Sequence, residues 1–223
     1  MIVWDGGNND FPFFRSNLEI TVADPLRVGD ETGYFPGEVN LRRAAIIVIN
    51  KVNAATEAQV SALEQSIAAV NDTAHVVRTD SRITATDPAC IAGKRVLVVE
   101  DGPTVTHGNM PGGAALAAAR KFGAAEIIDP RPFAVGSIAR LYGTYRHLGP
   151  VLPAMGYQPD QIRELQSTIE SVPCDIVLSA TPADLSRLMT LTKRVDRVFY
   201  DISEQPGDPL KGRILRFLAD LRR

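Results

Sequence analysis

Two uninterrupted apolar runs limit most strongly how this chain can fold. One spans residues 45–49 and the other spans residues 96–99, and polar residues follow each run at once. Apolar runs without alternation are typical of strands that are buried on both faces, as in a parallel sheet covered by helices. We therefore expect an α/β fold in which polar loops follow the carboxyl ends of buried strands.

The rest of the sequence alternates short apolar runs with segments of helical period. Strands are expected at residues 2–4, 18–22, 45–49, 75–78, 95–100, 126–128, 175–180 and 197–202. Helices are expected at residues 56–70, after the glycines at 112–113, at 159–172, at 182–191 and in the final segment. Thr56 and Gln59 predict a capping box at the start of the first of these helices, and Thr181 is the expected cap of the helix at 182–191.

The stretch 81–94 is the expected linker between two domains, because Pro88 and Gly93 interrupt it and no periodicity crosses it. Residues 1–88 and 94–223 are the two expected domains. The final helix has an apolar stripe, which fits either packing against the chain itself or binding of a partner.

Composition excludes several classes of partner. The formal net charge of -2 gives no electrostatic attraction for nucleic acid or for an anionic membrane. No apolar stretch reaches the roughly 18 residues that a membrane span needs, so a cytoplasmic location is expected. Cys90 and Cys174 do not form a C-x-x-C metal motif and are expected as free thiols. The expected partners are small molecules, and a homo-oligomer is left open.

The segment Asn50-Lys51-Val52-Asn53 follows the first buried run as the N-K-x-D loop of GTPases follows its strand. In this interpretation Asn50 ties neighbouring loops together and the stem of Lys51 covers the base. Asn53 takes the place of the aspartate that accepts hydrogen bonds from guanine. An amide has one acceptor oxygen and two N–H donors, so Asn53 suits adenine as well as guanine. The alternative is a polar turn without a ligand.

Two further positions fit a nucleotide site. Asp80 and Ser81 follow the next expected strand, where GTPases present a loop to the base. Asp5, Gly6 and Gly7 follow the first expected strand, where P-loop enzymes place an aspartate near magnesium and glycine near the γ-phosphate. Asp5 is therefore the expected metal residue and a catalytic candidate, although an Asp-Gly pair is also a common turn. The phosphate-binding pattern G-x-x-x-x-G-K-[ST] does not occur in this sequence.

The second buried run leads into an acidic and glycine-rich segment that precedes a helix. Ligands bind at the carboxyl ends of strands in open α/β sheets, and free amides at the start of a helix attract anions. Asp101 and His107 are the expected catalytic groups, and Glu100 is a further candidate for metal binding or proton transfer. The expected phosphate- or substrate-binding residues are Thr104, Thr106, Gly108, Gly112, Gly113 and Arg131. The alternative is a turn rich in capping residues.

Seven strings of the sequence together resemble the cyclic 2,3-diphosphoglycerate synthetase family and its GTPase-like relatives. They are WDGGNNDFPF from residue 4, PGEVNL from 36, INKV from 49, VVEDGPT from 98, THG from 106, DPRP from 129 and VLPAMGY from 151. The similarity extends from the first residues to about residue 202. Asn53 and Asn109 depart from the family, which more often has aspartate and glycine at these positions.

The resemblance implies that this chain corresponds to the C-terminal portion of a longer protein whose N-terminal region holds a P-loop. It implies a partial P-loop NTPase-like, mostly parallel sheet followed by a second, Rossmann-like α/β domain. It also implies an NTP-dependent phosphoryl-transfer enzyme, a ligase that uses Mg²⁺ with ATP or GTP and acts on a small phosphorylated acid. Because phosphoryl transfer depends on positioning and charge neutralisation, the chain alone is expected to be inactive.

Two other hypotheses stay open, so the sequence does not decide whether the chain itself is an enzyme. Asn53 in place of aspartate would fit a non-catalytic, GTPase-like nucleotide-binding or regulatory module. Alternatively, the residues after Lys94 could form an independent small-molecule enzyme that uses Asp101 and His107.

Overall fold

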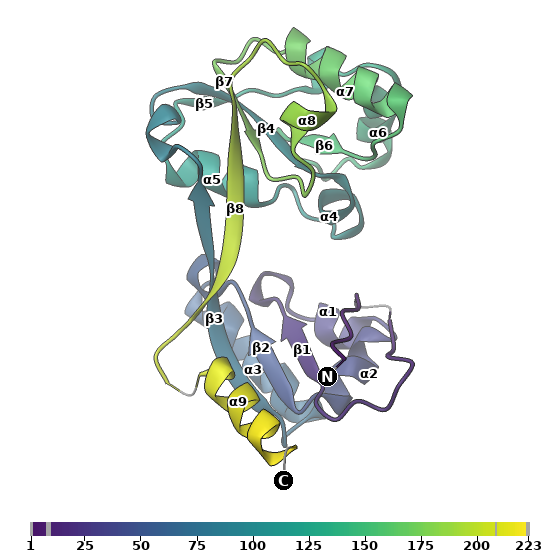
Figure 1. Ribbon diagram of the computed structural model, residues 1–223, viewed down its shortest axis with the longest axis vertical. Helices are drawn as coiled ribbons and strands as arrows, with labels where there is room; N and C mark the ends of the chain where they lie inside the picture. Colours follow the sequence, from purple (N-terminus) through teal and green to yellow (C-terminus); the bar gives the residue numbers. More distant parts are fainter. Residues whose placement is uncertain (1, 8–9, 208, 222–223) are drawn as a thin grey trace. The chain divides into compact units, whose positions relative to one another are not determined.

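The computed structural model describes residues 2–7, 10–207 and 209–221. It is an α/β structure with a mostly parallel sheet flanked by helices, as the apolar runs predicted. Its contacts divide the chain into two compact units, Met1–Arg82 with Asp201–Arg223 (unit 1) and Ile83–Tyr200 (unit 2). The chain leaves unit 1 within β3 (His75–Ala85) and returns to it within β8 (Val195–Glu204), the two long strands in Figure 1.

Unit 1 is built on parallel strands with β2 in the middle. Its strands are β1 (Ile20–Ala23), β2 (Ile46–Ile49) and the first part of β3. Its helices are α1 (Asp30–Gly33), α2 (Gly37–Arg43), α3 (Glu57–Val70) and α9 (Leu210–Asp220), with short 3-10 turns at Pro25–Arg27 and Val52–Ala54. Every residue of β2 is buried, which explains its unbroken apolar sequence.

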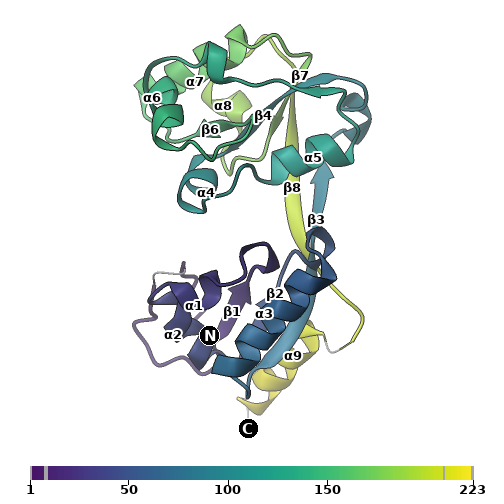
Figure 2. The same cartoon turned by 180° about the vertical axis from the view of Figure 1, so that it is seen from behind.

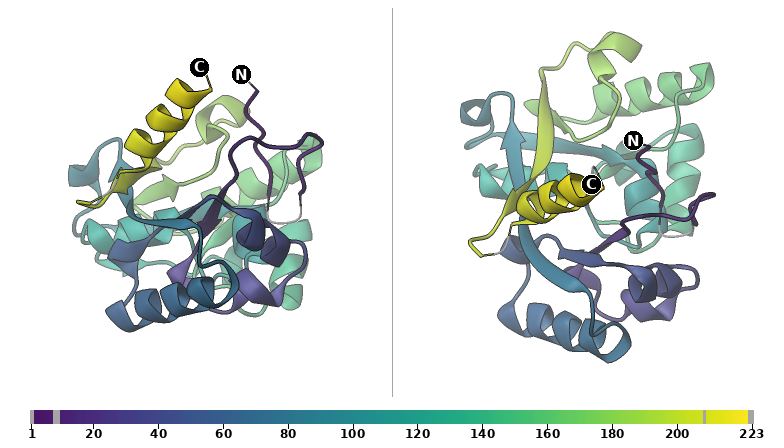
Figure 3. Two further views of the ribbon diagram at one scale, coloured as in Figure 1. Left: turned by 90° about the horizontal axis from the view of Figure 1, so that it is seen from below. Right: turned by 60° about the horizontal axis from the view of Figure 1, so that its bottom comes forward.

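Different helices cover the two faces of β2. Ile47 packs in one cluster with Leu41 of α2 and Leu63 of α3. Val48 lies in a separate cluster, which Leu210 of α9 joins. Figure 3 shows α3 and α9 on opposite sides of these strands. The first turn of the final helix therefore packs against the chain itself.

Helix α3 begins as predicted. The Thr56 hydroxyl accepts a hydrogen bond from Gln59 N at 3.3 Å, and Gln59 Oε1 accepts one from Thr56 N at 2.9 Å. This reciprocal pair is a capping box, which satisfies two N–H groups that the helix itself leaves without partners. Val60, Leu63 and Ile67 form the buried side of the helix, three and four residues apart.

Unit 2 is centred on β4, which pairs with β7 along one edge and with β5 and β6 along the other (Figure 2). Its strands are β4 (Arg95–Asp101), β5 (Glu126–Ile127), β6 (Leu152–Ala154), β7 (Ile176–Ser179) and the first part of β8. Its helices are α4 (Gly102–His107), α5 (Ala114–Lys121), α6 (Gly136–Thr144), α7 (Pro159–Ser171) and α8 (Leu185–Leu188), with 3-10 turns at Pro88–Cys90 and Arg131–Phe133.

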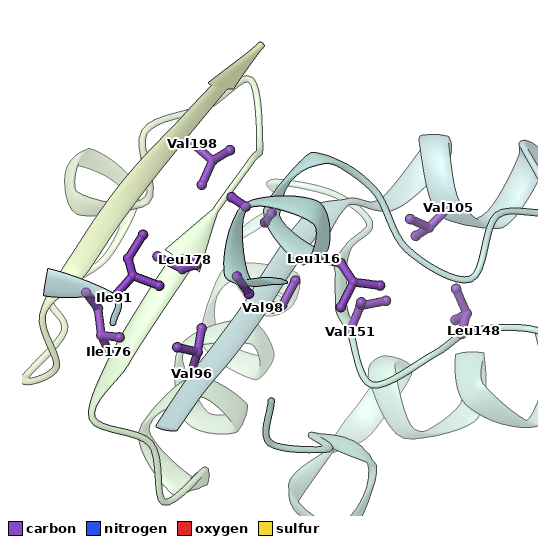
Figure 4. Packing of buried hydrophobic residues seen from close by; sticks show 13 residues of the cluster. Ile91, Val96, Val98, Val105, Leu116, Leu148, Val151, Ile176, Leu178 and Val198 are labelled. Atoms are coloured by element: carbon purple, nitrogen blue, oxygen red, sulfur yellow. The ribbon is translucent and has the colours of Figure 1, made fainter. Parts of the chain in front are cut away.

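Successive residues of β4 enter two different cores. Val96 and Val98 lie in one core, where Figure 4 shows them near Leu178 of β7. Leu97 and Val99 lie in the other core, which contains residues of α7. Both faces of β4 are thus covered, and this explains why its sequence does not alternate.

Three expectations about secondary structure are wrong. Residues 2–4 form no strand, and Ile2 and Val3 are 81% and 77% exposed, so no sheet buries their apolar side chains. Residues 81–85 continue β3, so the expected linker begins as a strand. The helix expected at 182–191 is limited to α8, because Asp184 rather than Thr181 accepts the capping hydrogen bond.

The division into domains at 1–88 and 94–223, and the P-loop NTPase-like and Rossmann-like character of these domains, stay predictions. In the described part of the chain, no helix is long and apolar enough to cross a membrane.

Candidate functional site

The loop after β2 is hydrogen-bonded to both neighbouring strands of unit 1. Asn50 N donates to Ala23 O of β1 at 3.0 Å. The Asn50 side chain accepts a hydrogen bond at Oδ1 from the hydroxyl of Thr79, a buried residue of β3, at 3.1 Å. Asn50 therefore links the ends of β1 and β2 to the middle of β3, and its role in a nucleotide site stays a prediction.

Lys51 has an unusual backbone and a charged partner. Its φ of 64° is left-handed, a conformation that non-glycine residues seldom adopt. Its Nζ lies 2.6 Å from Asp24 Oδ2, and the same carboxylate caps the 3-10 turn that follows β1. The Lys51 side chain is 36% exposed, and its ammonium is paired with Asp24. A nucleobase stacked on this stem would leave the ion pair in place.

Asn53 and Ser81 exchange two hydrogen bonds. Asn53 Nδ2 donates to Ser81 O at 3.1 Å, and Asn53 Oδ1 accepts from Ser81 N at 3.0 Å. An aspartate could not make both bonds, because a carboxylate only accepts. Asn53, which replaces the aspartate of N-K-x-D, thus has a structural role: its side-chain amide binds the backbone of β3 at Ser81. A base would have to compete with Ser81 for this side chain.

The other predicted residues of unit 1 are less closely connected to this loop. Asp80 Oδ1 accepts a hydrogen bond from Gln205 Nε2 at 2.9 Å. Gly7 N donates to Asp10 Oδ2 at 2.8 Å in a short turn, and a Cβ on Gly6 would lie 2.7 Å from the Trp4 indole nitrogen. Among the residues that the structure describes, no hydrogen bond joins Asp5 to the loop after β2.

Asp5 remains a prediction as the magnesium residue. Within residues 2–7, 10–207 and 209–221, no three His, Cys, Asp or Glu side chains gather in a group that could hold a metal ion. Magnesium in nucleotide-dependent enzymes commonly uses one or two carboxylates together with substrate phosphates. A cofactor of Mg²⁺ with ATP or GTP therefore stays a proposal.

In unit 2, the Glu100 carboxylate occupies the start of α5. Its Oε1 accepts hydrogen bonds from Gly113 N at 2.9 Å and Leu116 N at 2.8 Å, and its Oε2 accepts one from Ala115 N at 3.4 Å. The residue is 2% exposed, and burial raises the pKa of Glu100 although these amides favour its charged form. Among the glycine amides expected to bind phosphate, that of Gly113 is therefore bound by the chain's own carboxylate, and that of Gly108 donates to Thr104 O.

The glycines of this segment permit close packing. A Cβ at Gly113 would lie 2.7 Å from Glu100 Oε2. A Cβ at Gly112 would clash with the side chain of Leu116, and a Cβ at Gly108 would clash with the carbonyl oxygen of Thr104. Steric need thus explains these glycines without a ligand.

Asp101 caps the short helix α4. Its Oδ2 accepts hydrogen bonds from the Thr104 hydroxyl at 2.7 Å and from Thr104 N at 3.4 Å. The Thr106 hydroxyl donates to Gly102 O at 2.9 Å and lies 3.1 Å from His107 Nδ1. Both threonines thus stabilise α4 internally. His107 is exposed at the last residue of α4, and it stays a candidate for proton transfer.

Arg131 lies against its own neighbour. Its Nε is 2.9 and 2.8 Å from the two carboxylate oxygens of Asp129, and hydrogen bonds from Arg131 lower the pKa of Asp129. A substrate anion would have to share this guanidinium with Asp129.

The sequence interpretation gave no ligand-binding role to three polar residues at the ends of β6 and β7. The Ser179 hydroxyl lies 2.9 Å from the Thr181 hydroxyl, which donates to Ala183 O at 2.7 Å. Burial raises the pKa of Tyr157, which follows β6, and the nearby side chain of Thr181 partly offsets this rise. The sequence signal that could have identified these three residues is the one that identified Asp101, namely polar residues close behind an apolar run.

No protein-family model matches the chain. Over 209 residues the chain is 53% identical to a protein of Thermococcus kodakarensis named arginine synthetase ArcE. The match covers 94% of this chain and 46% of that protein, so the chain spans about half the length of this relative. The relative is of the synthetase type that the resemblance implied, but it is not specifically a cyclic 2,3-diphosphoglycerate synthetase.

Proposed function

We propose that this chain acts within a ligase-like synthetase that couples cleavage of ATP or GTP, in the presence of magnesium, to the synthesis of a small metabolite. The main support is the 53% identity to the Thermococcus arginine synthetase. Because the match covers 94% of the chain, the two units resemble one synthetase rather than two unrelated proteins.

In this proposal unit 1 contributes to nucleotide binding. Asn50 links β1, β2 and β3, the stem of Lys51 packs on the base, and Asp80 and Ser81 border the base. Asp5 assists magnesium. Asn53 supports the loop through Ser81, so base specificity comes from backbone groups and does not favour guanine.

Unit 2 binds the small substrate in this proposal. The resemblance to cyclic 2,3-diphosphoglycerate synthetase suggests a phosphorylated acid, whereas the name of the Thermococcus relative suggests an amino acid. The filled amides at the start of α5 weigh against a phosphate there, since Glu100 would repel it. We therefore favour an amino acid related to arginine.

Nucleotide binding by the purified chain tests this proposal. Titration calorimetry with Mg-ATP and Mg-GTP should give weak but saturable binding, further weakened by Lys51→Ala. A Lys211→Ala variant, on the exposed side of α9, is the matched control. Nucleotide hydrolysis by the chain alone should be absent. Steady hydrolysis that Asp5→Ala abolishes would contradict the expected inactivity, and absence of any nucleotide binding would contradict the role of unit 1.

A second candidate function is a non-catalytic nucleotide-binding module. The observation in its favour is that both the donor and the acceptor of the Asn53 amide are engaged by the backbone of Ser81. Tight nucleotide binding, with no contribution to synthesis when the chain is placed in a complete synthetase, would favour this module.

A further inference from the structure

The strand order of unit 2 reverses beside β4. After β4 the chain forms β5 and β6, which pair with one edge of β4. It then crosses to the other edge, where β7 lies, followed by β8. In open α/β sheets, ligands bind outside the carboxyl ends of the strands at such a reversal. The carboxyl ends of β4 and β7 therefore define a specific place to look for a ligand.

The register identifies the residues at this place. Val99 pairs with Ser179, and Ala180 N donates to Val99 O at 3.0 Å. Extending this register by two residues sets Asp101 beside Thr181. On the other edge of β4, Asp101 pairs with Ala154, the last residue of β6. The carboxyl ends of β4, β6 and β7 thus lie side by side at one end of the sheet, and Asp101 is the last residue of β4.

Tyr157 adds a phenol to this group. Burial raises the pKa of Tyr157, and the nearby charge of Asp101 raises it further. Hydrogen bonds with Ala183 and Thr181 act in the opposite direction. Tyr157 follows Ala154, the register partner of Asp101, by three residues, so its phenol belongs to the neighbourhood of Asp101 and Thr181.

Asp101, Tyr157 and Thr181 together offer a negative charge and oxygen acceptors, which suit a cationic hydrogen-bond donor. Asp101 is half-buried, and the hydrogen bonds described above use its Oδ2. A carboxylate has two oxygens with about four acceptor positions, so it can also bind a guanidinium. Arg187 of α8 and Arg197 of β8 are paired with Asp184 instead.

We propose that Asp101, Tyr157 and Thr181 form a binding site for the guanidinium group of arginine or of a closely similar amino acid. This inference rests on the proposed function and names the substrate position within it. Asp101 is the counter-ion, since carboxylate and guanidinium form paired, charge-assisted hydrogen bonds. The hydroxyls of Tyr157 and Thr181 orient the planar group.

Calorimetric titration of L-arginine into the 223-residue chain tests the site. Asp101→Asn is the informative variant, because asparagine also caps helices well and α4 should be kept. We expect its affinity to fall by on the order of tenfold or more. Tyr157→Phe should weaken binding less. Asp160→Asn changes the same charge at an exposed position of α7 and should bind normally. Circular dichroism verifies that each variant is folded.

L-norvaline and inorganic phosphate are the comparison ligands. L-norvaline lacks the guanidinium and should not bind. Equal binding of L-norvaline, unchanged arginine affinity in Asp101→Asn, or binding of phosphate but not arginine would each overturn the proposal, as would the absence of arginine binding to the folded chain. Since this test measures binding without turnover, it can fail while the synthetase function holds.

Discussion

Glu100 is the residue whose surroundings differ most from those of an ordinary carboxylate. Burial raises its pKa above the ordinary value of 4.5, so the folded protein binds the proton more tightly than the unfolded chain. Protonated Glu100 contributes to the stability of the folded protein. This contribution is fully present below the pKa of Glu100 in the unfolded chain, and it is lost as the pH rises through the pKa of Glu100 in the folded protein. Ionised Glu100 is thus tolerated, rather than favoured, by the fold.

We therefore predict a specific pH dependence for Glu100→Gln. The difference in free energy of unfolding between the native protein and this variant should become smaller as the pH rises from about 4 to about 7. Urea unfolding at several pH values measures it, and Glu126→Gln, at an exposed position, is the matched control. A difference that grows with pH would mean that the three amides outweigh burial and lower the pKa.

Asn53→Asp tests the pairing with Ser81. A carboxylate cannot donate to Ser81 O and would repel it, so we expect a loss of stability of about 1 kcal/mol. Gln65→Glu introduces the same charge on the exposed side of α3 and should change stability by less than about 0.5 kcal/mol. Equal effects of the two substitutions, measured by urea unfolding, would show that the Asn53 amide does not hold β3.

Residues of the candidate site could be predicted from the sequence only where neighbouring residues in the chain determine their position. Asn50 and Asp101 were identifiable because each lies within two residues of the end of a buried apolar run. The backbone amides that bind Glu100 could not be identified from the sequence. They lie 13 to 16 residues later in the chain and come close to Glu100 only when α5 packs against β4. Thr181 was predicted as a helix cap, but its hydroxyl bonds to Ala183 O instead.

Helix α3 is the element that the sequence defines best, because its cap and its apolar side are both local. Thr56→Ala removes the hydroxyl of the capping box and should cost about 1 kcal/mol of stability. Ser61→Ala lies on the exposed side of the same helix and should have little effect or slightly stabilise it. Thermal unfolding of both variants checks the difference, and equal melting temperatures would contradict the cap.

Helix α9 is separated from the rest of unit 1 by the whole of unit 2 in the sequence. Leu210→Ala should loosen the cluster that contains Ile46, Val48 and Val77. Hydrogen exchange measured by mass spectrometry should become faster in β2 and early β3 and stay unchanged in β4 and β7. Leu215→Ala, at a residue that is 56% exposed, is the control. Equal exchange in all strands would contradict the packing of α9 in unit 1.

The elements that the sequence failed to predict have weak local signals. Helices α2 and α6 begin at glycines, and β6 contains Pro153. These segments form because they pack against stronger elements: Leu41 of α2 lies in the core beside Ile47, and β6 pairs with β4. The buried strands β2 and β4 needed no such context, since their unbroken apolar sequences already require burial on both faces.

At the scale of the whole molecule, the chain enters unit 2 in β3 and returns in β8. This path explains why a sequence boundary was hard to place. Residues 83–85 continue a strand that began in unit 1, and the chain re-enters unit 1 within the other long strand. The similarity to arginine synthetase spans both units, so the functional proposal concerns the chain as a whole.

A chimeric synthetase tests the central claim most directly. This chain would replace the matching part of the Thermococcus arginine synthetase, and NTP-dependent formation of arginine would be measured under conditions in which the Thermococcus protein itself is active. We predict that the folded chimera makes arginine and that Asp101→Asn lowers this activity more than Asp160→Asn does. A folded chimera that binds nucleotide but makes no arginine would contradict the proposed synthetase function.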